Sequence, residues 1–198
     1  MERDERRQLI MDSAIALFVE KGVEQTKIVD ISKKAEIGKS TFYEYFKNKA
    51  DLVCQWLAEK MASVQVSEEM LANLPDQSAK ITLLLRESCN PELASREMMA
   101  MFVEFWRLAI NERHPQAQEM MKSMYAVYSD LLCGWLREGV ASGEFVEHDE
   151  EKVAAGLIGG IDGLWLQFLV FGDSYRLDEN VETYVATLLT GLRPGRSQ

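Results

Sequence analysis

The chain has 198 residues, of which 47% are apolar and 27% charged, which suits a globular protein with a substantial core. Its four prolines and twelve glycines form no low-complexity tract, and this excludes a fibrous or largely disordered chain. The formal net charge is −10, but residues 1–50 hold ten Lys or Arg against nine Asp or Glu, so the excess acid lies after residue 50. We expect a cytoplasmic protein with no membrane contact, since the first ten residues are charged and no apolar run approaches the length of a membrane span.

The spacing of apolar residues predicts an all-α fold of about nine helices, with no alternation long enough for a sheet. A first helix is predicted over 4–21, ended by Gly22. Thr26 is expected to cap a short second helix, and a third helix follows over 39–46. Asn48 is expected to cap a fourth helix that runs to about residue 61.

Five further helices are predicted downstream, separated by Pro or Gly at Pro75, Pro91, Pro115, Gly143 and Gly172. They cover about 76–89, 92–112, 116–141, 149–171 and 178–191. The natural internal boundary is expected near the end of the first 47 residues, inside a continuous helical array.

The segment TKIVDISKKAEIGKSTFYEYFKNK, residues 26–49, has six lysines against three acids. Two short helices joined by a tight turn are typical of a helix-turn-helix, in which the second helix enters the major groove by its N-terminal end. A basic surface of this kind attracts DNA phosphates even on an acidic protein. The outward positions of the second helix are Lys39, Ser40, Thr41, Tyr43 and Glu44.

At these positions the sequence resembles the TetR family of bacterial transcriptional regulators. The matching positions are Ala14, Leu17, Phe18, Gly22, Thr26, Asp30, Ile31, Ala35, Ile37, Thr41, Phe42, Tyr43, Tyr45, Phe46, Lys49 and Leu52. The resemblance implies a three-helix DNA-binding domain over residues 1–48 and a ligand-binding and dimerisation domain over 49–198. It also implies a repressor that binds a palindromic operator on double-stranded DNA and is released by a small-molecule effector.

The resemblance assigns roles to residues of the helix-turn-helix. Tyr43 and Lys49 match positions that contact phosphates, and Thr26 and Tyr45 match positions that often do so. Lys39, Ser40 and Thr41 match positions that reach base edges. Lys27 stands where the family has Ser or Thr and can still meet a phosphate. The predicted DNA-binding set is Thr26, Lys27, Lys39, Ser40, Thr41, Tyr43, Tyr45 and Lys49.

The segment 150–172 is apolar almost all round, which a helix exposed to water would not be. We expect it to form a homodimer interface together with the last helix, through about 150–191. The alternative is an intramolecular core helix. Residues 161–166 also resemble the C-terminal domain of the BetI-type subgroup, which supports dimerisation.

Methionines and aromatic residues gather in the helices predicted over 92–112 and 116–141, as suits an adaptable cavity. The alternative is ordinary core packing. The predicted ligand-binding set is Met99, Phe102, Phe105, Trp106, Met124, Tyr125, Tyr128 and Trp165. A small hydrophobic or cationic ligand is expected, with an aromatic box near Glu104 for a cation.

An enzyme is the first competing class, but the two histidines, His114 and His148, sit in no metal-site or triad pattern. We therefore expect no enzymatic activity, no catalytic residue, no metal and no cofactor. A second competing class is a helical small-molecule-binding or interaction protein without DNA binding. The mechanism we expect is that the effector shifts the fourth helix and changes the separation of the two recognition helices.

Overall fold

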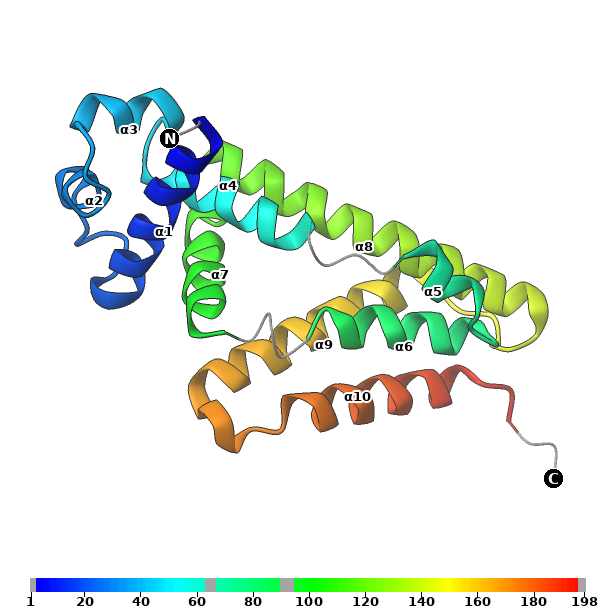
Figure 1. Ribbon diagram of the computed structural model, residues 1–198. Coiled ribbons are helices and arrows are strands. Elements are labelled where there is room, and N and C mark those ends of the chain that lie inside the picture. Colours follow the sequence, from blue (N-terminus) through cyan, green and yellow to red (C-terminus); the bar gives the residue numbers. More distant parts are fainter. Residues whose placement is uncertain (1–2, 63–66, 90–94, 196–198) are drawn as a thin grey trace. The chain divides into compact units, whose positions relative to one another are not determined.

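The computed structural model describes residues 3–62, 67–89 and 95–195, and this part of the chain forms ten α-helices, one 3₁₀ turn and no strand (Figure 1). The all-α prediction is confirmed. One helix was missed in the sequence: α5 (Glu68–Ala72), which is too short to show a period and is capped by the Ser67 hydroxyl. The break predicted at Pro91 lies outside the described residues.

The helices belong to two compact units, Met1–Ser63 with Ala94–Ser123 and Val64–Leu93 with Met124–Gln198. The first unit contains α1 (Arg3–Lys21), α2 (Ile28–Lys34), α3 (Lys39–Tyr45), α4 (Lys49–Ala62) and α7 (Arg96–Ala109). The second contains α5, α6 (Gln77–Glu87), α9 (Glu150–Phe171) and α10 (Leu177–Leu192). The long helix α8 (Pro115–Ser142) contributes to both. A division by role at residue 48 stays a prediction.

In the first unit, α1 packs against α2 and α7, and α7 also packs against α4. The helix α1 ends at Gly22, whose φ of +84° lets its N–H bond to the Phe18 carbonyl at 2.8 Å. The helix α4 begins after Asn48, whose side chain accepts from the Asp51 N–H at 2.9 Å, as its predicted capping role requires. The helix predicted over 92–112 corresponds to α7 and therefore shares a unit with the first four helices.

In the second unit, α10 packs along both α6 and α9. The core holds apolar side chains from all of these helices and from α8, such as Ile81, Leu132, Leu157 and Val185. Gly160 lies where α9 and α10 approach closely, because a methyl group there would overlap the Tyr184 ring. The Tyr184 hydroxyl donates to the Gly156 carbonyl at 2.5 Å, which further ties the two helices together.

A carboxylate from the turn after α8 caps the start of α6. Glu144 accepts from the backbone N–H groups of Gln77 and Ser78, both at 2.9 Å, and from the Ser78 hydroxyl. Burial alone would raise the pKa of Glu144, but the hydrogen bonds from Ser78 and Gln77 outweigh it and hold the pKa below its ordinary value. Glu144 is therefore a charged residue whose role is to join two segments of the second unit.

The helix α9 is long and apolar enough, by length and composition, to cross a membrane, and it alone passes that test in the described part of the chain. The expectation that no apolar run approaches the length of a membrane span did not allow for this helix, whose apolar stretch is interrupted by Asp162. One such helix is weak support for a membrane span. Its buried residues Ala154, Leu157 and Ile161 pack into the second unit, while Leu166, Val170 and Phe171 are exposed.

Candidate nucleic-acid interface and ligand site

The turn between α2 and α3 is fixed by backbone hydrogen bonds. The Ala35 N–H donates to the Ile31 carbonyl and the Ile37 N–H to the Ser32 carbonyl, both at 2.9 Å. The residue between them, Glu36, has a φ of +53°, a conformation that costs a non-glycine residue on the order of 1 kcal/mol. The turn thus holds the two short helices at one angle, which a helix-turn-helix needs.

The inner face of α3 is anchored by two aromatic side chains. Phe42 and Phe46 are fully buried, and their ring centroids lie 5.7 Å apart. Ile31 of α2 is equally buried. With this face in the core, the rest of α3 is turned outward.

The outward side of the helix-turn-helix carries much of the predicted DNA-binding set. Lys39, Ser40 and Tyr43 are exposed, while Thr41 and Tyr45 are half-buried. Lys27, the residue before α2, is also exposed. The structure adds three exposed lysines that the sequence reading did not single out: Lys33, Lys34 and Lys47. Their signal was the excess of lysine over acid in residues 25–49.

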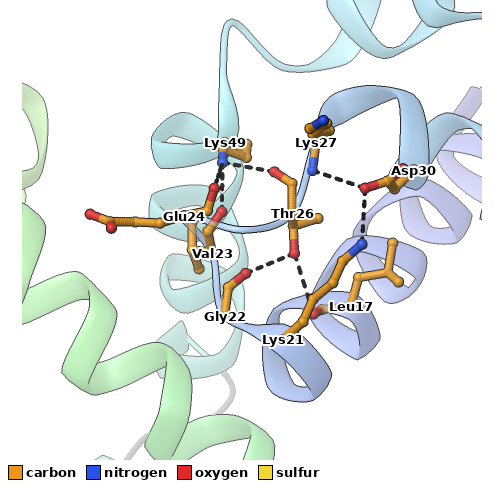
Figure 2. Close-up of polar contacts among 9 residues, drawn as sticks. All are labelled: Leu17, Lys21, Gly22, Val23, Glu24, Thr26, Lys27, Asp30 and Lys49. Atoms are coloured by element: carbon orange, nitrogen blue, oxygen red, sulfur yellow. Dashed lines mark hydrogen bonds and ion pairs between the residues drawn. The ribbon is translucent and has the colours of Figure 1, made fainter.

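Thr26 lies inside the first unit and has no exposed surface. Its hydroxyl donates to the Gly22 carbonyl at 2.8 Å, with the Leu17 carbonyl at 3.3 Å, and so holds the end of α1 to the start of α2 (Figure 2). The predicted phosphate contact by this side chain does not fit its burial. The predicted cap is also wrong, since the residue before α2 is Lys27.

Lys49 reaches back from the first turn of α4 to the same loop. Its ammonium Nζ donates to the carbonyls of Val23 (2.5 Å), Thr26 (2.8 Å) and Glu24 (3.3 Å) (Figure 2). Burial lowers the pKa of this ammonium. A lysine has three N–H donors, and all three are engaged within the unit. We call this arrangement of Lys49, Thr26 and their carbonyl partners the loop clamp.

Asp30 orders the start of α2 on the other side of the clamp (Figure 2). Its Oδ2 accepts from the Lys27 backbone N–H at 3.2 Å and pairs with the Lys21 ammonium at 2.9 Å. These hydrogen bonds, the one from Lys21 first, lower the pKa of Asp30. The backbone of Lys27 is thereby fixed while its side chain stays exposed.

Arg107 connects α7 to the loop before α2. Its guanidinium pairs with Glu24 at 3.2 Å and with Glu104 at 2.6 Å. The hydrogen bond to Glu104 raises the pKa of Arg107. Glu104 is already neutralised by this pair, so an aromatic box that uses its free charge to hold a cation does not fit the structure.

Four of the predicted ligand-binding residues come from α7 in the first unit. Phe105 is fully buried and packs as core, whereas Met99, Phe102 and Trp106 are half-buried. The indole Nε1 of Trp106 is buried and has no acceptor among the described residues. A buried N–H without a partner is costly, so Trp106 remains a candidate donor to a ligand.

The other four predicted ligand-binding residues lie in the second unit, and all of them are half-buried: Met124, Tyr125, Tyr128 and Trp165. The Tyr125 hydroxyl donates to Asp162 Oδ2 at 2.8 Å. Tyr128 is hydrogen-bonded to Ser88, and Trp165 to the Cys89 thiol. We call the six residues Ser88, Cys89, Tyr125, Tyr128, Asp162 and Trp165 the polar seam. Three of them were not predicted, since nothing in their local spacing marks them.

Two family models match this sequence. Residues 10–55 match the model of bacterial regulatory proteins of the tetR family, and residues 77–192 match that of the BetI-type transcriptional repressor, C-terminal. The chain belongs to the TetR family. It is a DNA-binding transcriptional repressor under the control of a small-molecule effector, and the family resemblance seen in its sequence is confirmed.

Curated relatives of the repressor are also transcriptional regulators. The fatty acid metabolism regulator protein of Bacillus subtilis (strain 168) is 27% identical over 177 residues, which are 89% of this chain and 81% of that protein. The regulator TtgR of Pseudomonas putida is 27% identical over 97% of this chain and 93% of its own length.

Solved structures share the fold over nearly the whole repressor. FadR from Bacillus subtilis in complex with stearoyl-CoA has a TM-score of 0.76 at 25% identity, covering 94% of this chain and 99% of that one. A putative regulator from Saccharomonospora viridis in complex with choline has a TM-score of 0.75 at 20% identity, covering 95% and 97%. The second likeness supports the fold alone.

Proposed function

We propose that the repressor binds a palindromic operator as a homodimer, with α3 of each subunit in the major groove. The observation that carries this proposal is the two-sided character of α3, with Phe42 and Phe46 in the core and Lys39 and Ser40 exposed at its N-terminal end. A lysine there can donate to guanine O6 or N7, and hydroxyl groups can bond to bases or phosphates.

The base contacts are assigned to Lys39, Ser40 and Thr41. Phosphate contacts are assigned to Lys27, Tyr43 and Tyr45. Lys49 and Thr26 act through the loop clamp, which keeps α1, α2 and α4 in the arrangement that presents α3. No catalytic step is assigned to any residue, and we place the protein in the cytoplasm, where its DNA target is.

The test is a mobility-shift titration with the DNA upstream of the repressor's own gene, at low and at moderate salt. We expect a specific complex whose affinity falls steeply as salt rises, because phosphate contacts release counterions. Absence of a complex at low salt, where the phosphate contribution is strongest, would reject the proposal.

The dimer is assigned to the exposed faces of α9 and α10. Val170 is 79% exposed and Phe171 59% exposed in the single chain, although both follow a strongly apolar stretch. Leu166, one turn before Val170 on α9, is exposed as well. Exposed apolar side chains grouped in this way mark an interface in a globular protein. Two subunits related by a two-fold axis then read the two half-sites of a palindrome.

Val170→Glu tests this assignment, with Val127→Glu on α8 as the matched control, because Val127 is also exposed (59%). Sedimentation equilibrium is expected to show dimers for the wild type and the control, and monomers for Val170→Glu. Circular dichroism should show helical content unchanged in all three. If Val170→Glu remains dimeric, the interface lies elsewhere.

The effector is proposed to be a small hydrophobic or cationic molecule bound in the region of residues 49–198. Choline, found in one related structure, is therefore the cationic first probe, and stearoyl-CoA, found in the other, is the anionic probe with a long apolar chain. Within the first unit, Lys49 joins α4 to the loop before α2 and Arg107 joins α7 to Glu24 of the same loop. A displacement of α4 or α7 would move the loop before α2 through these contacts and so change the position of α2.

Operator affinity measured with and without saturating effector tests this coupling. A lower affinity with effector is expected, and Arg107→Ala should reduce the difference while leaving the effector-free affinity within a few-fold of the wild type. Equal affinities with and without bound effector would reject the coupling.

A further inference from the structure

Asp162 is an acidic side chain at the edge of the apolar core of the second unit. It stands on α9 next to Ile161, which is buried in that core. Its carboxylate accepts one hydrogen bond from the described residues, that of the Tyr125 hydroxyl at 2.8 Å. No described Lys, Arg or His lies within ion-pair distance of it.

A half-buried carboxylate usually has two or three donors or a cation, because removing its charge from water is expensive. Glu144 of the same unit illustrates the satisfied case, with three donors around its two oxygens. Asp162 has one donor, and burial raises its pKa more strongly than the Tyr125 hydrogen bond lowers it. The described residues therefore leave this carboxylate with fewer hydrogen-bond donors than a partly buried charge normally has.

The neighbours of Asp162 are aromatic. Tyr125 is hydrogen-bonded to it, and Trp165 follows one turn later on α9. Trp165 is also hydrogen-bonded to the Cys89 thiol, whose pKa is raised by burial and by the nearby Asp162 charge. Tyr128 stands on α8 one turn after Tyr125 and bonds to Ser88. Aromatic faces beside a carboxylate favour a positively charged group, which they attract through the ring quadrupole.

The other acidic side chain considered for this role is excluded by its partner. Glu104 is held by Arg107 at 2.6 Å, so it has no uncompensated charge to offer. Asp162 keeps its charge available, and it lies among three of the residues that the sequence already assigned to a ligand: Tyr125, Tyr128 and Trp165.

We propose that Asp162 is the anionic anchor of the effector site and that the effector is an organic cation, an amine or a quaternary ammonium with apolar substituents. The inference rests on the proposed effector-controlled function and names the class of effector and the residue that selects it. In this site the positive charge of the effector balances the negative charge of the Asp162 carboxylate. Tyr125, Tyr128 and Trp165 cover the apolar parts of the effector. An anionic effector is repelled by the same carboxylate.

The experiment is isothermal titration calorimetry of the full-length protein with choline, decyltrimethylammonium and tetraphenylphosphonium, and with stearoyl-CoA as the anionic probe. We expect at least one cation to bind, and Asp162→Asn to weaken it tenfold or more. Asp130→Asn is the matched control, because Asp130 is an exposed acid on α8 of the same unit. It should bind the cations as the wild type does.

A second measurement needs only the wild-type protein, in case Asp162→Asn does not fold. The neutral isosteres of the same probes, with a quaternary carbon in place of nitrogen or phosphorus, should bind at least tenfold more weakly than the cations. Binding of none of the three cations, equal binding of a cation and its isostere, or equal binding by Asp162→Asn would each overturn the proposal. Operator binding of the effector-free protein is measured separately, so failure of the repressor function is distinguishable from failure of the cation site.

Discussion

Two clusters of wholly or partly buried polar groups in this repressor differ in how many of their hydrogen bonds the described residues supply. In the loop clamp, Thr26 and Lys49 direct their donors at backbone carbonyls, and the three ammonium N–H groups meet three acceptors. In the polar seam, the Asp162 carboxylate has one donor, Tyr125, within the part of the chain that the structure describes. A buried polar group with all its hydrogen bonds made stabilises the fold, whereas one with too few hydrogen bonds can accept them from an external partner.

The contrast separates structural from functional residues better than residue type does. The family resemblance predicts that Lys49 contacts DNA, whereas its three hydrogen bonds to backbone carbonyls make it a structural brace. Asp162 looks like an ordinary helix residue by type and is the under-satisfied group by geometry.

Removal of the clamp should give the largest effect. Lys49→Ala leaves three carbonyls without their donor and should lower the free energy of unfolding by about 2–3 kcal/mol, with weaker binding to every DNA sequence alike. Thermal unfolding followed by circular dichroism measures the first, and titration against several DNA sites the second. Lys47→Ala, at an exposed neighbour, is the control for stability and should leave the free energy of unfolding unchanged. If Lys49→Ala weakens DNA binding at unchanged stability, Lys49 is a phosphate contact and the contrast fails.

The exposed side of the helix-turn-helix should show the reverse behaviour. Lys39→Ala is expected to leave the unfolding temperature unchanged and to reduce discrimination between operator and unrelated DNA by about 1–3 kcal/mol. Lys34→Ala, at the exposed end of α2, should instead weaken all sites alike. Competition titrations at one salt concentration measure both. An unaltered specificity ratio for Lys39→Ala contradicts its assignment to bases.

A satisfied carboxylate in the second unit provides the next test. Glu144→Gln should lower the free energy of unfolding by about 1 kcal/mol at pH 7, allowing for partial solvent screening, and should leave effector binding intact. Because the folded-state pKa lies below the ordinary value of 4.5, the stabilisation is present above pH 4.5 and is lost as pH falls through the folded pKa. The gap between wild type and variant should therefore close in acid, in denaturant titrations at several pH values. A gap that persists unchanged in acid means that charge is not the cause.

The smallest effect is expected at the start of α3. Gly38 is the N-cap residue and offers no side-chain cap, and an added Cβ would meet only Ser40 Oγ at 3.6 Å and Thr41 Oγ1 at 3.7 Å. Gly38→Ser should raise the free energy of unfolding by a few tenths of a kcal/mol. Gly22→Ser is the contrasting control, since the φ of +84° at Gly22 should make it destabilising by about 1 kcal/mol. Both are measured by denaturant titration.

The parts of the fold that depend on local signals were predictable from the sequence. Gly22 as a helix terminator, Asn48 as a cap and the spacing of Phe42 and Phe46 all act within a few residues, and the family resemblance rests on such positions. The assignment of α7 to the compact unit of the helix-turn-helix was not predictable, because it depends on packing between distant segments.

The site residues show the same limit. Lys49 meets carbonyls 23 to 26 positions earlier in the chain, and Tyr125 meets Asp162 37 positions later. The family resemblance assigned Lys49 and Thr26 to DNA, and no sequence pattern assigned Asp162 to a ligand. The DNA contacts of Lys27, Lys39, Ser40, Thr41, Tyr43 and Tyr45 remain predictions.

The three-fold donation by Lys49 has a consequence for chemical modification of the protein. Acetylation of a lysine removes its charge and leaves one N–H where there were three. An acetyl group on Lys49 would remove at least two of the three carbonyl contacts and would have to fit inside the loop. Acetylation at this position would then abolish DNA binding by destabilising the DNA-binding unit, whereas acetylation of Lys39 would change only the DNA sequence preference.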